Sequence, residues 1–185
     1  MISKIIKYTL SWIRIIKYKI IYGRRLKFRF RGLKSIYFGR GVKISIDNGC
    51  TLEFGEKIYI EDYCKFQCLG GNIVIGNNTY FNYNCNVVAL EGIHIGRDCL
   101  FGPNVGIYDH DHCFSDLNKR IAAQGFSKKN ILLKNNIWIG ANCTITKGVT
   151  IESGVIIGAN SIINKIIESS GLYGGVPAKF IKNIS

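Results

Sequence analysis

The sequence predicts an all-β protein whose body is a parallel β-helix of six-residue repeats, with an N-terminal amphipathic helix and one long excursion loop. Large aliphatic or aromatic residues recur at every sixth position, small residues recur four positions later, and the pattern breaks once, between Val105 and Leu133. With 185 residues, 47% of them hydrophobic, the chain is long enough for one such domain and too apolar for a disordered protein.

Positive charge is concentrated at the N-terminal end of the chain. Residues 1–46 hold 13 of the 25 Lys and Arg residues and no Asp or Glu, so the 12 basic residues that follow balance the 12 acidic ones. The net charge of +13 therefore belongs to this segment. After residue 22, basic and apolar residues alternate, which predicts a strand or an extended arm. The basic residues of this stretch are Arg24, Arg25, Lys27, Arg29, Arg31 and Lys34.

Residues 1–22 have the pattern of a basic amphipathic helix. One face carries Ile2, Ile5, Ile6, Ile13, Ile16 and Ile20 with Trp12 beside them, and the other carries Lys4, Lys7, Ser11, Arg14 and Tyr18. Charges interrupt the apolar residues too often for a membrane-spanning helix or a signal peptide.

Two interpretations of this helix remain open. In the first, it lies in the plane of an anionic membrane surface, with Tyr8, Trp12 and Tyr18 at the interface. In the second, it packs on its own domain or on a neighbouring subunit, with a solvated basic face. Nucleic-acid binding is disfavoured, because the aromatic residues are not interleaved among the cations as a stacking platform would require.

The six-residue frame is clearest over residues 139–168. Its repeats open at Ile139, Ile145, Ile151, Ile157 and Ile163, and earlier repeats open at Phe54, Ile60, Ile75, Phe81, Ile95 and Phe101. In a β-helix, each repeat makes a short strand and a turn, its first side chain points into the core, and its fifth residue must be small. Four of the seven cysteines occupy the fifth position: Cys64, Cys85, Cys99 and Cys143. We expect them to be core residues rather than disulfide or metal ligands, as suits a reducing cytoplasm.

Over residues 40–183 this pattern resembles the hexapeptide-repeat sugar O-acetyltransferases, such as the galactoside, maltose, capsule and O-antigen acetyltransferases. The resemblance implies a left-handed β-helix, acetyl-CoA as co-substrate, no metal, and a homotrimer. It divides the chain into a basic amphipathic segment (1–34), the β-helix (35–167) with its active-site loop (109–130), and a C-terminal loop and tail bordering coenzyme A (168–185).

The excursion loop carries His110 and His112. By resemblance, His110 matches the histidine that takes the proton from the acceptor hydroxyl, and His112 is the rival base. Imidazole suits this role because a sugar hydroxyl needs a base that titrates near neutral pH. The base must also be held in one tautomer, for which the candidates are Asp109, Asp111 and Asp116.

Three residues are candidates for acceptor binding. By resemblance, Asn82 matches an asparagine of the galactoside acetyltransferases that lines the acceptor site, and Asn84 follows two residues later. Amide side chains suit sugar hydroxyls because they donate and accept hydrogen bonds. Asn84 has an equal alternative role in an asparagine ladder that caps turns. The galactoside enzymes have a second, acidic residue that contacts the acceptor, and this chain has Leu90 at that position, with Glu91 beside it. We therefore expect a different acceptor from that of the galactoside enzymes.

The donor site is expected in the C-terminal half. By resemblance, Trp138 lies beside the catalytic pocket and the Ala141 N–H faces the thioester oxygen, where an amide would stabilise the oxyanion. The remaining matches are Ala159 and Asn164 along the pantetheine arm, and Lys179 and Lys182, in and after the closing Gly-Val-Pro-Ala-Lys run, near the nucleotide phosphates.

The sequence therefore predicts transfer of an acetyl group from acetyl-CoA to a sugar hydroxyl, in surface-polysaccharide biosynthesis. The location expected is the cytoplasm, with peripheral binding at the inner face of the membrane through residues 1–22 as one option. The alternatives are N-acetylation of an amino sugar, a zinc protein like the γ-class carbonic anhydrases, and a non-catalytic membrane-associated scaffold. The zinc alternative would use His94, His110 and His112, although the His-x-x-x-x-His spacing of that class is missing and we expect His94 to face solvent.

Overall fold

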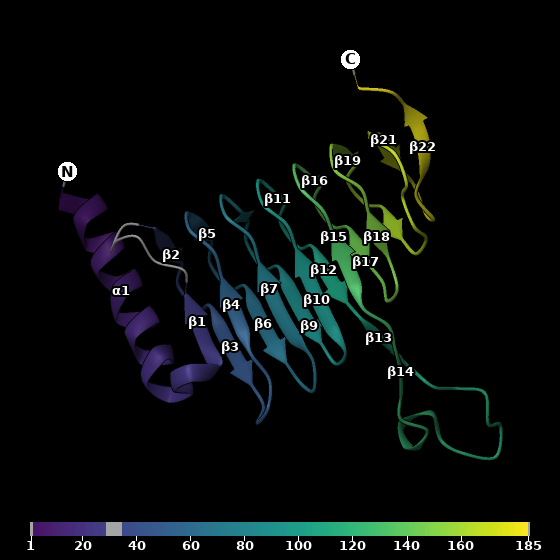
Figure 1. The fold of residues 1–185 in the computed structure, drawn as a ribbon, viewed down its shortest axis with the longest axis horizontal. Helices are drawn as coiled ribbons and strands as arrows, with labels where there is room; N and C mark the ends of the chain where they lie inside the picture. Colours follow the sequence, from purple (N-terminus) through teal and green to yellow (C-terminus); the bar gives the residue numbers. More distant parts are fainter. Residues whose placement is uncertain (1, 29–34, 185) are drawn as a thin grey trace.

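The computed structural model describes residues 2–28 and 35–184 and confirms the predicted fold, a left-handed parallel β-helix (Figure 1). Three sheets form its walls. Sheet A contains β1 (Leu26–Phe28), β4 (Leu52–Phe54), β7 (Asn72–Ile75), β10 (Gly92–Ile95), β15 (Ile131–Leu133) and β18 (Thr150–Ile151). Sheet B contains β2 (Ile36–Phe38), β5 (Ile58–Ile60), β8 (Tyr80–Phe81), β11 (Leu100–Phe101), β16 (Trp138–Ile139), β19 (Val155–Ile157), β21 (Gly171–Gly174) and β22 (Lys179–Lys182). Sheet C contains β3 (Lys43–Ile46), β6 (Lys65–Cys68), β9 (Asn86–Ala89), β12 (Gly106–Tyr108), β17 (Thr144–Ile145) and β20 (Ile162–Ile163).

The core follows the six-residue frame. The first residue of each repeat is buried, and aromatic rings fill the N-terminal coils, with Phe81 and Phe101 stacked at 4.6 Å between centroids. The four cysteines at the fifth position are buried and carry free thiols, as predicted. The Cys85 Sγ, for example, lies 3.2 Å from the Gly102 carbonyl of the next coil, so only a small residue fits there.

Asparagines form a ladder along the edge between sheets B and C. Asn84, Asn104, Asn142 and Asn160 each have a φ near +60°, and their side-chain amides bond from coil to coil at 3.0, 2.9 and 3.0 Å. Asparagine tolerates this left-handed conformation better than other residues with a side chain. The ladder therefore fixes the turns of successive coils in the same conformation.

Helix α1 (Ile2–Tyr22) lies across the open end of the first coil (Figure 1). Ser11 and Ile15 are buried against the β-helix. The Ser11 Oγ accepts the Phe38 N–H at 2.8 Å, Arg14 donates to the Phe38 carbonyl at 3.1 Å, and Tyr18 donates to the Val42 carbonyl at 2.9 Å. Among the described residues, β2 and β3 are the edge strands of their sheets at this end, so these bonds satisfy backbone groups that would otherwise be left open.

The helix therefore packs on its own domain, as one of the two interpretations expected, but the expectation that its basic face would be solvated was wrong. Ser11, Arg14 and Tyr18 face the β-helix, because their polar atoms reach its open strand edge, whereas most of the isoleucines face outwards: Ile5, Ile6, Ile13, Ile16 and Ile20. The side chains of Ile2 and Lys4 lie outside the described part of the chain. No helix in residues 2–28 or 35–184 is long and apolar enough to cross a bilayer.

The β-helix extends beyond the limits expected from the sequence. Arg24 and Arg25 lie in a 3-10 turn (Gly23–Arg25), and Lys27 lies in β1, which already belongs to sheet A. Arg29, Arg31 and Lys34 lie outside the described residues. At the other end, β21 pairs in parallel with β19, so coil structure continues past residue 167.

The excursion loop is an arm that projects from the body (Figure 1). Its base is an antiparallel pair of strands, β13 (His110–His112) and β14 (Phe126–Lys128). A short 3-10 helix, η2 (Ile121–Ala123), lies in the projecting part. The arm thus begins directly at the candidate histidines.

Candidate active site

Asp109 and His110 follow β12 at the corner between sheets C and A. The Asp109 side chain is fully buried, and its carboxylate accepts the backbone N–H groups of Leu90, Glu91 and Gly92 at 2.8, 2.8 and 2.7 Å. Its Oδ1 also lies 3.1 Å from the Nδ1 of His110. The carboxylate is therefore fixed by the corner of the preceding coil and contacts one ring nitrogen of the histidine.

This contact determines which nitrogen of His110 is available for chemistry. With Nδ1 donating to Asp109, Nε2 is the nitrogen that can accept a proton. The side chain is 17% exposed, and the Phe126 ring packs against it edge-on at 5.4 Å. An oriented and partly shielded imidazole is the arrangement that general-base catalysis requires.

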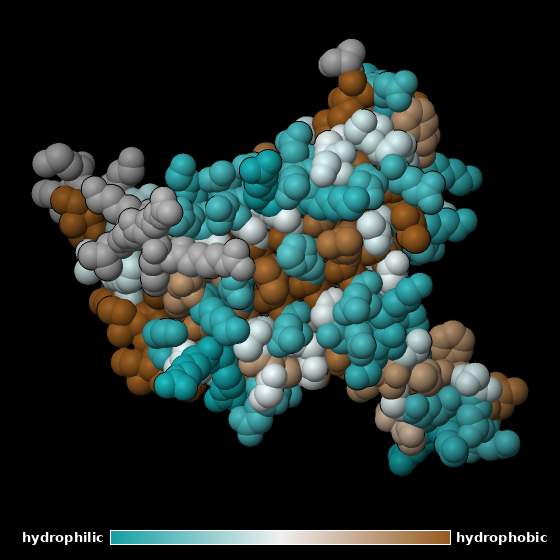
Figure 2. Space-filling model, viewed as in Figure 1, coloured by the Kyte–Doolittle hydropathy of each residue, from teal (hydrophilic) through white to brown (hydrophobic). Residues whose placement is uncertain are grey.

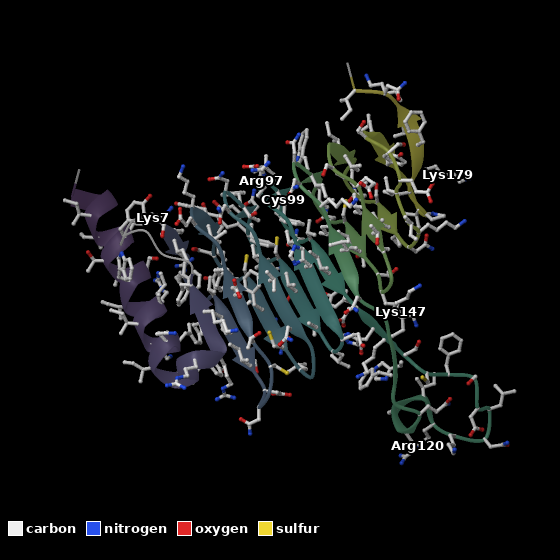
Figure 3. The ribbon with its side chains drawn as sticks, in the orientation of Figure 1. Lys7, Arg97, Cys99, Arg120, Lys147 and Lys179 are labelled. Atoms are coloured by element: carbon white, nitrogen blue, oxygen red, sulfur yellow. The ribbon has the colours of Figure 1, made fainter. Side chains whose placement is uncertain are left out.

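Of the three carboxylates considered, Asp109 is the one in contact with His110. Asp111 Oδ2 pairs with Lys147 Nζ at 2.9 Å, and Asp116 Oδ2 pairs with Lys119 Nζ at 3.1 Å. Figure 3 shows Lys147 near the base of the arm, whereas Arg120 lies in its projecting part.

The other histidines have different surroundings. His112 is exposed, with its ring 4.5 Å from that of Phe126. His94 is exposed on β10, as expected. Within residues 2–28 and 35–184, no group of three or more His, Cys, Asp or Glu side chains is arranged to hold a metal ion.

A hollow of about 520 Å³ lies along sheet B and its corner with sheet C. Four predicted site residues line it: Asn82, Trp138, Ala141 and Ala159. Trp138 is 52% exposed on β16, between Leu100 of β11 and Ile156 of β19. The hollow thus combines an apolar wall with the backbone of the 140–141 and 158–159 turns.

Asn82 and Asn84 differ in what their side chains bind. The Asn82 Oδ1 accepts the Tyr83 N–H at 2.8 Å, which orients the amide at the edge of the hollow. The Asn84 Nδ2 donates to Asn104 Oδ1 at 3.0 Å as the first member of the asparagine ladder. Of the two, Asn82 is therefore better placed to contact a substrate.

The C-terminal tail folds back onto the last coil. The Gly175 N–H donates to the Ser161 Oγ at 3.0 Å, and the Ala178 N–H donates to the Ile162 carbonyl at 2.8 Å. Lys179 and Lys182 are exposed on β22, which pairs antiparallel with β21, and Figure 3 shows Lys179 at this end of the molecule. Asn164 is exposed beyond β20, at the corner between sheets C and A.

The predicted residues form two groups at different edges of the β-helix. Asn82, Asn84, Trp138, Ala141 and Ala159 lie on sheet B or at its corner with sheet C. The corner between sheets C and A holds Asp109, His110, Glu91 and Asn164. Sheet C separates the two groups, so one chain does not bring the histidine to the hollow.

Lys128 was missed by sequence reasoning. Its Nζ lies 3.7 Å from Glu91 Oε2 and 3.3 Å from the Leu90 carbonyl, so it ties β14 to the corner that holds Asp109. The six-residue frame does not extend into the arm, and no motif in residues 113–130 placed this lysine.

The sequence is similar to bacterial acetyltransferases. The sequence model of the family described as bacterial transferase hexapeptide (six repeats) matches residues 130–165. The putative lipopolysaccharide biosynthesis O-acetyl transferase WbbJ of Escherichia coli K12 is 30% identical over 145 residues, covering 74% of each chain. The galactoside O-acetyltransferase of the same organism is 36% identical over 132 residues, which are 71% of this chain and 63% of that protein.

A solved structure shares the fold over nearly the whole chain. It is a point mutant of AntD, an N-acyltransferase from Bacillus cereus, in complex with dTDP-4-amino-4,6-dideoxyglucose and coenzyme A. The match has a TM-score of 0.74 at 22% identity and covers 91% of this chain and 88% of that one.

Proposed function

The chain belongs to the hexapeptide-repeat acetyltransferases, and from this premise we propose that it transfers an acetyl group from acetyl-CoA to a sugar hydroxyl, with His110 as general base. The observation that supports the proposal is the contact of Asp109 with His110 Nδ1, which leaves Nε2 for the acceptor proton. Relatives named as O-acetyltransferases support hydroxyl as the acceptor group.

The proposed reaction needs no acyl-enzyme. His110 Nε2 takes the proton of the acceptor hydroxyl while the oxygen attacks the thioester carbonyl. The N–H of Ala141 stabilises the negative charge on the tetrahedral carbonyl oxygen. When the carbon–sulfur bond breaks, the coenzyme A thiolate leaves and takes the proton from the imidazolium, which restores the neutral base.

We place this reaction between two copies of the chain in a homotrimer. Because His110 and the hollow lie on different edges of one β-helix, a neighbouring copy would present its hollow to His110. Trp138, Ala141 and Ala159 would hold the thioester and the pantetheine arm, with Lys179 and Lys182 near the phosphates. Asn164, at the other edge, would reach the donor only from the neighbouring copy.

The acceptor in this proposal is a sugar of a surface-polysaccharide precursor. The name of the WbbJ relative supports this class. Asn82 would bind a sugar hydroxyl, because its amide is held at the edge of the hollow. Glu91, which is paired with Lys128 at the histidine corner, would contact the acceptor from the side of the base.

The test is an acetylation assay that follows release of free thiol from acetyl-CoA with nucleotide sugars, amino sugars and oligosaccharides as acceptors. We expect thiol release with a hydroxyl acceptor, and a loss of at least ~10²-fold in turnover for His110→Ala with acetyl-CoA binding retained. Wild-type turnover in His110→Ala would refute the base assignment. Loss in His112→Ala alone would move it to that residue, and acetylation of amino sugars only would identify an N-acetyltransferase.

A further inference from the structure

Helix α1 presents an apolar surface that the fold does not use. The isoleucine face consists of aliphatic side chains that are between 45% and 78% exposed: Ile5, Ile6, Leu10, Ile13, Ile16 and Ile20. Figure 2 shows hydrophobic side chains along this end of the molecule. A helix on the surface of a water-soluble domain normally turns its polar side to solvent, and α1 does the opposite.

The isoleucine face is not required for attachment of the helix. The opposite side of α1 already packs on the first coil through Ser11 and Ile15 and through the hydrogen bonds of Arg14 and Tyr18. Tyr22 adds a hydrogen bond to the Ile44 carbonyl at 2.9 Å. An apolar surface of this extent, held rigidly by a polar face, indicates a binding partner.

The charges around the isoleucine face are mostly positive: the two carboxylates beside it, Glu61 and Asp62, share a hollow next to Ile6 and Leu10 with the cations Lys7, Arg14 and Arg40. Exposed cations lie along its border and beyond its C-terminal end, at Lys17, Arg24 and Lys27, and residues 1–46 contain no carboxylate. On the adjacent strands β3 and β6, the paired residues Lys43 and Lys65 line a hollow of about 400 Å³ beside Tyr18. The partner must therefore offer an apolar layer bordered by negative charge.

We propose that α1 anchors the protein in the plane of an anionic lipid bilayer. The isoleucine face enters the boundary between headgroups and acyl chains, and the surrounding cations bind lipid phosphates. Because α1 lies at one end of the β-helix and β22 at the other, the body of the molecule extends away from the membrane (Figure 1). This inference is independent of the reaction that the protein catalyses.

The experiment uses the full chain and vesicles of phosphatidylcholine with or without about one third phosphatidylglycerol, separated by flotation. The test variant combines Ile13→Ser, Ile16→Ser and Ile20→Ser, all at exposed positions. The matched control is Ile166→Ser, because Ile166 is 56% exposed and Ile13 58% exposed, while Ile166 lies at the C-terminal end of the β-helix. A second variant, Lys17→Gln with Arg24→Gln and Lys27→Gln, removes charge only.

We expect the wild-type protein to bind the anionic vesicles and the triple serine variant to bind at least ~10-fold more weakly, since each isoleucine loses burial in the bilayer. Ile166→Ser should bind like the wild type, and the glutamine variant should lose the preference for anionic lipid. The proposal fails if the wild type does not bind, or if the serine variant binds as well as Ile166→Ser. It also fails if the serine substitutions change the oligomeric mass in solution and leave vesicle binding intact, because the face would then join copies of the chain.

Discussion

The Nδ1 atom of His110 lies 3.1 Å from Oδ1 of Asp109, and this carboxylate also accepts three backbone N–H bonds from residues 90–92. The position of the imidazole is therefore set both by a corner of the preceding coil and by the Phe126 ring of the arm, which packs against it at 5.4 Å. The rigid β-helix thus holds the carboxylate that orients His110.

The first prediction concerns this carboxylate. Asp109→Asn replaces one acceptor oxygen by an NH2 group that faces a backbone N–H or the histidine, so it should lower the free energy of unfolding by about 1–3 kcal/mol. Turnover should fall at least ~10-fold, because the asparagine no longer holds the tautomer with Nε2 free. Urea denaturation measures the first effect, and steady-state kinetics measure the second.

Asp111→Asn is the control for this prediction. Asp111 is exposed and pairs with Lys147, so its removal should change stability by less than about 1 kcal/mol. If Asp109→Asn kept wild-type kcat while losing stability, Asp109 would serve only to join two coils.

The second prediction tests whether the active site lies between copies. Ala159→Trp should block the hollow, and His110→Ala removes the proposed base, so we expect each variant alone to be inactive. When the two are co-expressed in equal amounts, a site made from two neighbouring chains would be intact in about a quarter of cases, and activity should recover to that level.

The controls for this mixing experiment are the two variants purified separately and a tag on each chain that proves mixed assemblies form. Mixed assemblies without any recovery would mean that His110 and the hollow act within one chain.

The core was predictable because its cause is local and repeated. Large core residues such as Ile139 and Phe101 recur at a fixed spacing. The burial of Cys99 and Cys143 follows from that spacing alone. The packed face of α1 was not predictable in this way. Hydrophobic periodicity assigns isoleucine to the interior, whereas Ser11 and Tyr18 face inwards because the first coil offers unpaired backbone groups, which no pattern within the helix reveals.

The site was predictable only in part for a related reason. Motifs picked out His110 and Trp138, which lie on β13 and β16, but no motif explained why Asp109 rather than Asp111 or Asp116 should contact the histidine. Asp109 differs from the other two because the backbone of residues 90–92, in another coil, lies against it. Contacts between coils of this kind depend on the register of the β-helix. A six-residue period does not fix this register near Gly70–Gly71 and Glu91–Gly92, where the repeat frame shifts by a few residues without a long insertion.

The third prediction concerns cysteine reactivity. Burial raises the pKa of the Cys68 thiol to about 12 and that of Cys99 to about 11, from an ordinary value of 9.0. A raised pKa leaves less of the reactive thiolate at pH 8, and burial also blocks access. Cys113, which is half-buried in the arm, should therefore react first with iodoacetamide in the native protein. Peptide mass spectrometry of samples taken over time measures the order of labelling.

The control is the same reaction in urea, where all seven cysteines should be modified. Rapid labelling of Cys68 or Cys99 in the native protein would contradict their place in the core.

The fourth prediction separates two roles of the asparagine ladder at Asn104: its side-chain hydrogen bonds between coils and its tolerance of the left-handed backbone conformation. This residue has a φ of 60°, and its amide bonds Asn84 on one side and Asn142 on the other. Asn104→Gly loses both side-chain bonds but keeps easy access to the left-handed conformation, whereas Asn104→Ala loses the bonds and adds about 1 kcal/mol of backbone strain. Urea denaturation should therefore rank the proteins as wild type, then glycine, then alanine. Equal stabilities for the two variants would show that the ladder acts through its hydrogen bonds alone, and an alanine variant as stable as the wild type would mean that the turn does not need asparagine.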